Sequence, residues 1–266
     1  MNGRVGSTLL MQLLATSPRI VFDREYPFGE YRYLSYCARI ATVMADHEHR
    51  DGVTPFFFSS TAAGPIPWEP QSLDRPALAP GALRGLWWAC SDGFRAQAPD
   101  AALYAEKLVA DPATITDAGI PLRIVDLVRD PRDVLASIRA FTARGIDGFD
   151  RITDQDEDDY RDQFVERTRT RLRALADVHG CARQLLRYED VATDLPATAA
   201  TLGAWLGETL DADAVLAERD RYDHHVTTGS VTESIGRWRR DLRPDEADAV
   251  WSGLADLLEP LGYREA

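Results

Sequence analysis

The chain has 266 residues, of which 45% are hydrophobic and 27% are charged. These proportions are ordinary for a globular protein and exclude a disordered or fibrous chain. Its 30 basic and 43 acidic residues give a formal net charge of −13. Proteins that bind the phosphate backbone of nucleic acids usually carry the opposite sign, so we expect no nucleic-acid partner.

The cysteines and the apolar runs indicate the compartment in which the protein folds. Cys37, Cys90 and Cys181 lie far apart in the sequence, and no two of them have metal-ligand spacing. We therefore expect neither a disulfide framework nor a metal site, and a reducing cytoplasm fits best. The sequence has no run of about 18 apolar residues, so we predict no transmembrane helix.

Apolar periodicity predicts alternating helices and strands along the chain. Helices are expected at 7–16, 28–45, 82–98, 131–142, 163–179, 194–206, 211–219 and 244–258. Strands are expected at 19–22, 102–106, 122–128 and 183–187. The segments 47–79 and 147–162 are rich in Pro and Gly or in acidic residues, and we predict that they are loops or lids.

The order of these elements indicates the fold class. Strands separated by helices of about 10–20 residues are typical of βαβ units and a parallel sheet. The sequence shows neither an internal repeat nor a linker that divides it cleanly. We therefore predict one α/β domain over 1–266, in which helices flank a central parallel sheet.

A glycine-rich turn, GRVGSTLL at 3–10, leads into the first expected helix. Gly3 and Gly6 let the backbone approach an anion closely, and the start of the helix adds a partial positive charge. The plain alternative is an ordinary capped helix start. The turn lacks the lysine of a Walker A motif, which disfavours a magnesium-dependent P-loop kinase.

A second candidate phosphate site is LVRDPRDVLAS at 127–137, where a buried strand runs into a helix. Arg129 falls at the carboxyl end of that strand, where open parallel sheets bind ligands. Ser137 follows eight residues later, so a guanidinium and a hydroxyl could hold one phosphate group together. The plain alternative is a surface ion pair between Arg129 and Asp133.

These two motifs, with LRYED at 186–190 and SIGRWRR at 234–240, resemble the sulfotransferase family that uses 3′-phosphoadenosine 5′-phosphosulfate (PAPS). The resemblance extends from residue 3 to about 243 and is greatest to bacterial, tyrosylprotein and carbohydrate sulfotransferases. It implies a P-loop-like three-layer fold and no metal cofactor. It also implies that the 5′-phosphosulfate is held by Arg4, Val5, Gly6, Ser7, Thr8 and Leu9, the 3′-phosphate by Arg129 and Ser137, and the remainder of the nucleotide by Tyr188, Gly236, Arg237, Trp238 and Arg239.

The family places a strand directly before the glycine-rich turn, whereas this sequence has only Met1 and Asn2 there. An absent strand would leave a sheet edge unpaired. We therefore expect either natural residues upstream of Met1 or a rudimentary first strand.

Sulfuryl transfer needs a cation near the leaving oxygen and a base near the acceptor. Arg4 is the first candidate for the cation. Lys107 is the second, because it is the single lysine among 30 basic residues and lies in YAEK at 104–107, at the end of the strand expected at 102–106. It resembles the strand-end lysine of tyrosylprotein and some carbohydrate sulfotransferases.

Three positions are candidates for the base. Glu25 lies 21 residues after Arg4, and this spacing resembles that of the glutamate base in tyrosylprotein sulfotransferases. Glu106 resembles the base of the heparan N-sulfotransferases, but neighbours on a strand point to opposite faces, so it competes with Lys107. The third candidate is the adjacent pair His224 and His225.

The sequence therefore predicts a PAPS-dependent sulfotransferase whose acceptor is a hydroxyl or amine of a small molecule, lipid or carbohydrate. The negative charge and the aromatic residues favour a neutral or apolar acceptor. A non-catalytic nucleotide-binding protein of the same fold is the alternative, followed by a P-loop kinase. The expected ligands are the nucleotide donor and the acceptor, and we consider a homodimer as the oligomeric state.

Overall fold

The computed structural model describes residues 3–25, 28–45, 75–144, 156–177, 179–218 and 231–265. Most of the segment expected as a lid at 47–79, the part of the second lid up to residue 155, and the pair His224 and His225 lie outside these residues. Among the described helices, none is long and apolar enough to cross a membrane.

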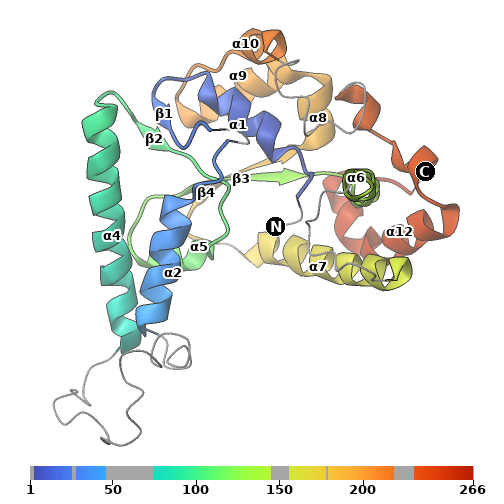
Figure 1. Ribbon diagram of the computed structural model, residues 1–266, viewed down its shortest axis with the longest axis horizontal. Helices are drawn as coiled ribbons and strands as arrows, with labels where there is room; N and C mark the ends of the chain where they lie inside the picture. The colour runs from blue at the N-terminus through green and yellow to red at the C-terminus, as the bar shows by residue number, and fades with distance from the viewer. Residues whose placement is uncertain are drawn as a thin grey trace, which may run out of the picture.

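The described residues form four strands and a larger set of helices (Figure 1). The strands are β1 (Ile20–Val21), β2 (Leu103–Tyr104), β3 (Arg123–Val128) and β4 (Ala182–Arg187). The helices are α1 (Ser7–Ala15), α2 (Tyr33–Ala45), α4 (Arg75–Gln97), α5 (Pro112–Asp117), α6 (Pro131–Thr142), α7 (Glu157–Asp177), α8 (Tyr188–Thr193), α9 (Leu195–Leu206), α10 (Ala212–Ala217), η2 (Thr232–Ser234), α11 (Trp238–Asp241), α12 (Pro244–Leu258) and η3 (Glu259–Leu261).

Both strand pairs are parallel, as the alternation of helices and strands predicts. β1 pairs with β2 from Ile20–Leu103 to Val21–Tyr104, and β3 pairs with β4 from Arg123–Ala182 to Val128–Arg187. The α/β class is thus confirmed. Among the described residues, however, the strands form two separate two-stranded sheets rather than the single central sheet that we expected.

Parts of both expected loops are helical. Residues 75–79 form the first turns of α4, and 157–162 form the first turns of α7. The acidic residues of α7 favour its start, because the carboxylate of Asp156 accepts hydrogen bonds from the backbone N–H groups of Asp158 (2.8 Å) and Asp159 (3.2 Å). Carboxylates in a first helical turn also interact favourably with the helix dipole.

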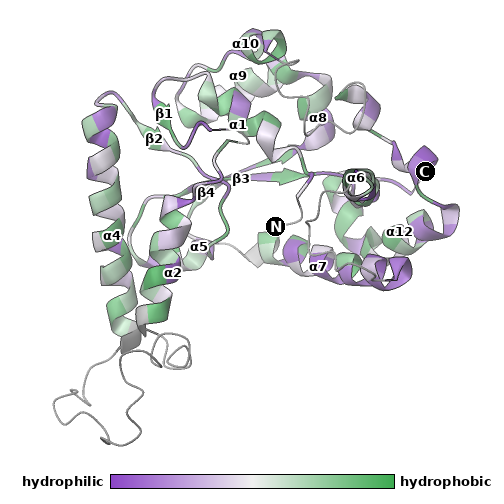
Figure 2. Ribbon diagram, in the orientation of Figure 1, coloured by the Kyte–Doolittle hydropathy of each residue, from purple (hydrophilic) through white to green (hydrophobic). Residues whose placement is uncertain are grey.

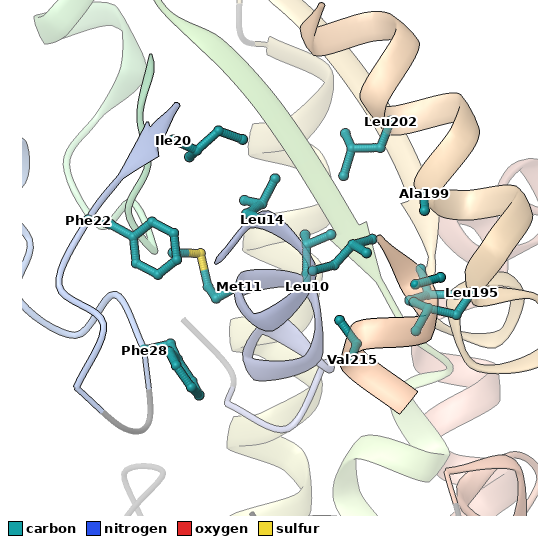
Figure 3. Close-up of a cluster of buried hydrophobic side chains, with 13 residues drawn as sticks. Leu10, Met11, Leu14, Ile20, Phe22, Phe28, Leu195, Ala199, Leu202 and Val215 are labelled. Carbon is teal, nitrogen blue, oxygen red and sulfur yellow. The ribbon is translucent and has the colours of Figure 1, made fainter. Parts of the chain in front are cut away.

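Helix α1 occupies the centre of one core cluster (Figure 3). Its buried residues Leu10, Met11 and Leu14 lie between Ile20, Phe22 and Phe28 on one side and residues of α8, α9 and α10 on the other. All four strands contribute to the same cluster, through the buried Ile20 of β1 and the partly buried Leu103 of β2, Val125 and Leu127 of β3, and Leu186 of β4. One helical layer therefore covers both sheets.

Two further clusters complete the core. One joins Val128 and α6 to α7 and α12. Helix α7 is hydrophilic over most of its length (Figure 2), but it buries Tyr160 and Phe164, which lie four residues apart on one face. The other joins α2, α4 and α5. In it, Cys37 and Cys90 are free thiols with Sγ atoms 3.8 Å apart, and burial raises the pKa of Cys37 to about 12.

We expect Leu202→Ala in α9 to lower the free energy of unfolding by about 2–5 kcal/mol, because Leu202 is fully buried and truncation leaves a cavity. Leu216→Ala in α10 is the matched control, since Leu216 is 48% exposed. Urea denaturation measures both. Equal losses in the two variants would contradict this position of the core.

Candidate functional site

The loop before α1 has a constrained backbone. Arg4 has a φ of 71° and Gly6 a φ of 91°, both in the left-handed region, which a non-glycine residue such as Arg4 occupies only at a cost. Gly6 is the N-cap of α1, and no side chain accepts a hydrogen bond from the N–H groups there. The predicted glycine-rich turn thus presents helix N–H groups that lack a capping side chain, an arrangement suited to anions.

Gly6 lies directly against the ring of Tyr188, the first residue of α8. A Cβ at position 6 would be 2.2 Å from Cδ2 of that ring. The hydroxyl of Tyr188 lies 2.8 Å from Oγ of Ser234, in the late loop. Tyr188 therefore joins three of the motifs that the sequence singled out.

The turn from β3 to α6 sets the position of Arg129. The carboxylate of Asp130 accepts a hydrogen bond from N of Arg132 (2.9 Å), and Pro131 occupies the first helical position, where its missing N–H costs nothing. These two residues begin α6 immediately after β3. Arg129 is consequently fixed at the carboxyl end of the strand.

Arg129 is buried rather than paired at the surface with Asp133. Its Nη1 donates to the carbonyl oxygen of Arg4 (2.8 Å), and its Nη2 donates to that of Ser234 (2.7 Å). The guanidinium carbon lies 4.3 Å from the centre of the Tyr188 ring. The buried Nε of Arg129 has no hydrogen-bond partner.

Ser137 joins the same group of residues from α6. Its buried hydroxyl accepts a hydrogen bond from Nε of Arg4 at 3.0 Å. The guanidinium of Arg4 also lies 4.9 Å from the centre of the Phe141 ring, one helical turn further along α6. The two predicted phosphate motifs are therefore in direct contact.

Asp133, which sequence reasoning did not assign to the site, anchors the late loop. Its carboxylate accepts hydrogen bonds from the backbone N–H groups of Gly236 (2.7 Å) and Trp238 (3.0 Å). Burial raises the pKa of Asp133 to about 6, and the two hydrogen bonds oppose that rise. Of the predicted basic residues in this loop, Arg237 is buried and paired with Asp241 (2.6 Å), whereas Arg239 is exposed and lies 4.4 Å over the Trp238 ring.

Lys107 and Glu25 belong to a second group of residues, which follows the ends of β1 and β2. Lys107 is 7% exposed, and its Nζ donates to Oε1 of Glu30 at 2.7 Å. Glu25 is exposed, and its backbone N–H donates to Oδ1 of Asp23 (3.2 Å). Glu30 is the member of this group that sequence reasoning missed.

The carboxylate of Glu106 holds the start of α2. It accepts hydrogen bonds from N of Leu34 (3.0 Å), from N (3.1 Å) and Oγ (2.5 Å) of Ser35, and from the hydroxyl of Tyr104 (2.9 Å). Both oxygens of the Glu106 carboxylate are therefore occupied by hydrogen bonds within the fold. Within the described part of the chain, no three His, Cys, Asp or Glu side chains are grouped so that they could hold a metal ion.

We expect Gly6→Ala to destabilise the fold by about 1–3 kcal/mol, because alanine tolerates the left-handed backbone poorly and its Cβ collides with Tyr188. Gly85→Ala in α4 is the matched control, since a Cβ there meets nothing within 4 Å. Chemical denaturation compares the two. A Gly6→Ala variant as stable as the control would contradict the contact with Tyr188.

Comparison with known proteins shows the fold. No family model matches the chain, and neither does any curated protein. Among solved structures, the sulfotransferase domain from the Synechococcus PCC 7002 olefin synthase matches with a TM-score of 0.55 and 18% identity, over 98% of this chain and 92% of that domain. The sulfotransferase domain from the curacin biosynthetic pathway matches with a TM-score of 0.47 and 14% identity, over 95% and 94% respectively. The first of these likenesses shows that the chain has the fold of a sulfotransferase domain.

Proposed function

We propose that the protein is a sulfotransferase that moves a sulfuryl group from PAPS to a hydroxyl or amine. The observation that carries this proposal is the position of Arg129. Its hydrogen bonds to Arg4 and Ser234 bring the glycine-rich loop and the late loop together at the carboxyl end of β3, where ligands of open parallel sheets bind. The fold shared with the olefin synthase domain supports the same activity.

The chemistry of the residues fits a doubly anionic nucleotide. The hydrogen bonds of Arg129 go to carbonyl oxygens, and its Nε has no partner, so its charge and one N–H suit a phosphate. We assign the 3′-phosphate to Arg129 and Ser137, the 5′-phosphosulfate to Arg4, Val5, Gly6, Ser7, Thr8 and Leu9, and the remaining nucleotide contacts to Tyr188, Gly236, Arg237, Trp238 and Arg239.

Arg4 has to change partners for this assignment to hold. In the structure its Nε donates to Ser137, the residue that we assign to the opposite end of the donor. Donor binding therefore requires the Arg4 side chain to leave Ser137 for the phosphosulfate. Exchange of one hydrogen bond for a charge-assisted bond to an anion is favourable.

In the proposed reaction the bond between sulfur and the bridging oxygen of the donor breaks, and a bond forms between sulfur and the acceptor atom. The cations of Arg4 and Lys107 stabilise the charge on the leaving oxygen, which departs on 3′-phosphoadenosine 5′-phosphate. The acceptor proton passes to Glu25, whose exposed carboxylate is accessible to an acceptor. No metal ion takes part in this scheme.

Aromatic rings support a neutral or apolar acceptor, such as a small molecule, lipid or carbohydrate. Tyr33 packs against Phe94 with ring centres 5.2 Å apart, and Phe94 stacks on Tyr104 at 5.1 Å. Tyr31 and Tyr33 remain 55% and 38% exposed. These rings surround the end of β2, which precedes Lys107, so an apolar acceptor could bind beside them.

The donor assignment is tested by nucleotide binding. We expect 3′-phosphoadenosine 5′-phosphate, but not ATP with Mg²⁺, to raise the unfolding temperature.

Arg129→Lys keeps the charge but loses the fork that binds two carbonyl oxygens, so calorimetry should show that the affinity for 3′-phosphoadenosine 5′-phosphate is weakened by about tenfold or more. Arg123→Lys, at the other end of β3, is the control and should bind normally. Stabilisation by neither nucleotide would leave a sulfotransferase fold without donor binding and would contradict the proposal.

The proposed base is tested by Glu25→Gln. The amide cannot accept the acceptor's proton, so turnover of labelled PAPS with a pooled cell extract should fall by about 100-fold or more. Affinity for 3′-phosphoadenosine 5′-phosphate should not change. Glu166→Gln on α7, where the carboxylate is 73% exposed, is the control. A wild-type rate in Glu25→Gln would exclude Glu25 as the base.

A further inference from the structure

The loop between β1 and α2 contains two consecutive residues with left-handed backbones. Phe28 has a φ of 63° and Gly29 a φ of 65°. Their N–H groups donate to the carbonyl oxygens of Glu25 (2.6 Å) and Asp23 (2.8 Å), and the Phe28 side chain is buried in the core around α1. A left-handed phenylalanine is strained, and such strain concentrates at functional sites.

This turn places Glu30 against Lys107. Nζ of Lys107 donates to one carboxylate oxygen of Glu30 at 2.7 Å, and Arg32 donates to the other at 2.6 Å. The side chain of Lys107 is 5% exposed, whereas that of Glu30 is 37% exposed. The most buried member of this group is therefore the only lysine of the protein.

A buried ammonium needs a counter-charge to stay protonated. Burial lowers the pKa of Lys107, the contact with Glu30 raises it, and the nearby charge of Arg32 lowers it. The carboxylate of the neighbouring Glu106 binds the start of α2 instead. The pKa of Lys107 is lowered overall by burial, and the close contact with Glu30 opposes that decrease and favours the charged ammonium.

The loops that carry Glu30 and Lys107 and the helix that follows the glycine-rich turn all adjoin the core cluster around α1. Glu30 follows β1, Lys107 follows β2 and Arg129 follows β3, each after the carboxyl end of its strand. Side chains from both sheets pack around α1, the helix whose start carries the glycine-rich loop. Carboxyl ends of parallel strands are where such folds bind ligands.

We propose that Glu30 is a positioning residue, which holds the ammonium of Lys107 charged and oriented for the oxygen that leaves with the donor's phosphate. The inference rests on the proposed sulfuryl transfer. The reaction places negative charge on that oxygen, and an ammonium stabilises it whereas a neutral amine does not. Arg4 supplies the second cation, so the loss of Glu30 weakens the reaction without abolishing donor binding.

The single lysine allows a direct test. Protein labelled with ¹³C,¹⁵N-lysine has one lysine side-chain signal, so an NMR titration measures the pKa of Lys107 alone. We expect Glu30→Gln to lower that pKa by about one unit or more, because the charged form loses its partner. Glu30→Asp should restore most of it, and Arg32→Gln should raise it. An unchanged pKa in folded Glu30→Gln would overturn the proposal.

The pH dependence of turnover tests the role in the reaction. The assay follows release of 3′-phosphoadenosine 5′-phosphate from PAPS, with a pooled extract as the acceptor source. On the alkaline limb of the pH–rate profile, the rate should fall at a lower pH in Glu30→Gln than in the wild type. The difference should equal the change in the pKa of Lys107 that NMR measures. The affinity for 3′-phosphoadenosine 5′-phosphate should change less than kcat. A shifted pKa with an unshifted alkaline limb would overturn the role of Glu30 in catalysis. Absence of turnover in the wild type would instead overturn the proposed function, whatever the NMR titration shows.

Discussion

The structure of the site depends on how one buried guanidinium is bound. Arg129 connects residues that are 125 and 105 positions away, Arg4 and Ser234, and lies over the ring of Tyr188. Burial of an arginine is costly unless hydrogen bonds and charge compensate it. Here the hydrogen bonds are to carbonyl oxygens, which carry only partial charge. The nearby carboxylate of Asp133 also interacts with its charge, and in the proposed function an anionic donor adds to that compensation.

The second cation at the strand ends is compensated differently. Lys107 forms a close ion pair with Glu30, on a loop whose strained turn is held by Phe28 and Gly29. Arg32 donates to the other oxygen of the same carboxylate, so Lys107 has a charged partner where Arg129 has hydrogen bonds to carbonyl oxygens. In the proposed reaction, Arg129 contributes to donor binding, whereas Lys107 acts together with Arg4 on the leaving oxygen. This separation is why changes at the two positions should affect affinity and turnover unequally.

Short-range sequence patterns predicted those helices and strands whose ends are set by neighbouring residues. Helix α6 begins and ends where expected, because Asp130 caps it and Pro131 fits its first turn. β3 is a six-residue strand, one residue shorter than expected. The prediction was wrong for 157–162, where clustered acidic residues indicated a loop but in fact favour the start of α7. The short helix α8 was missed, because Tyr188 follows β4 without a break in the apolar pattern.

The site could be predicted only in part, for a related reason. Arg4, Gly6, Arg129, Ser137 and Tyr188 were identified from motifs, and the structure brings them together. Asp133 and Glu30 were missed, and they act through contacts with Trp238 and Lys107, which are 105 and 77 residues away in the sequence. No local pattern encodes such a contact, since a carboxylate or hydroxyl in a polar loop looks the same whether it is solvated or buried.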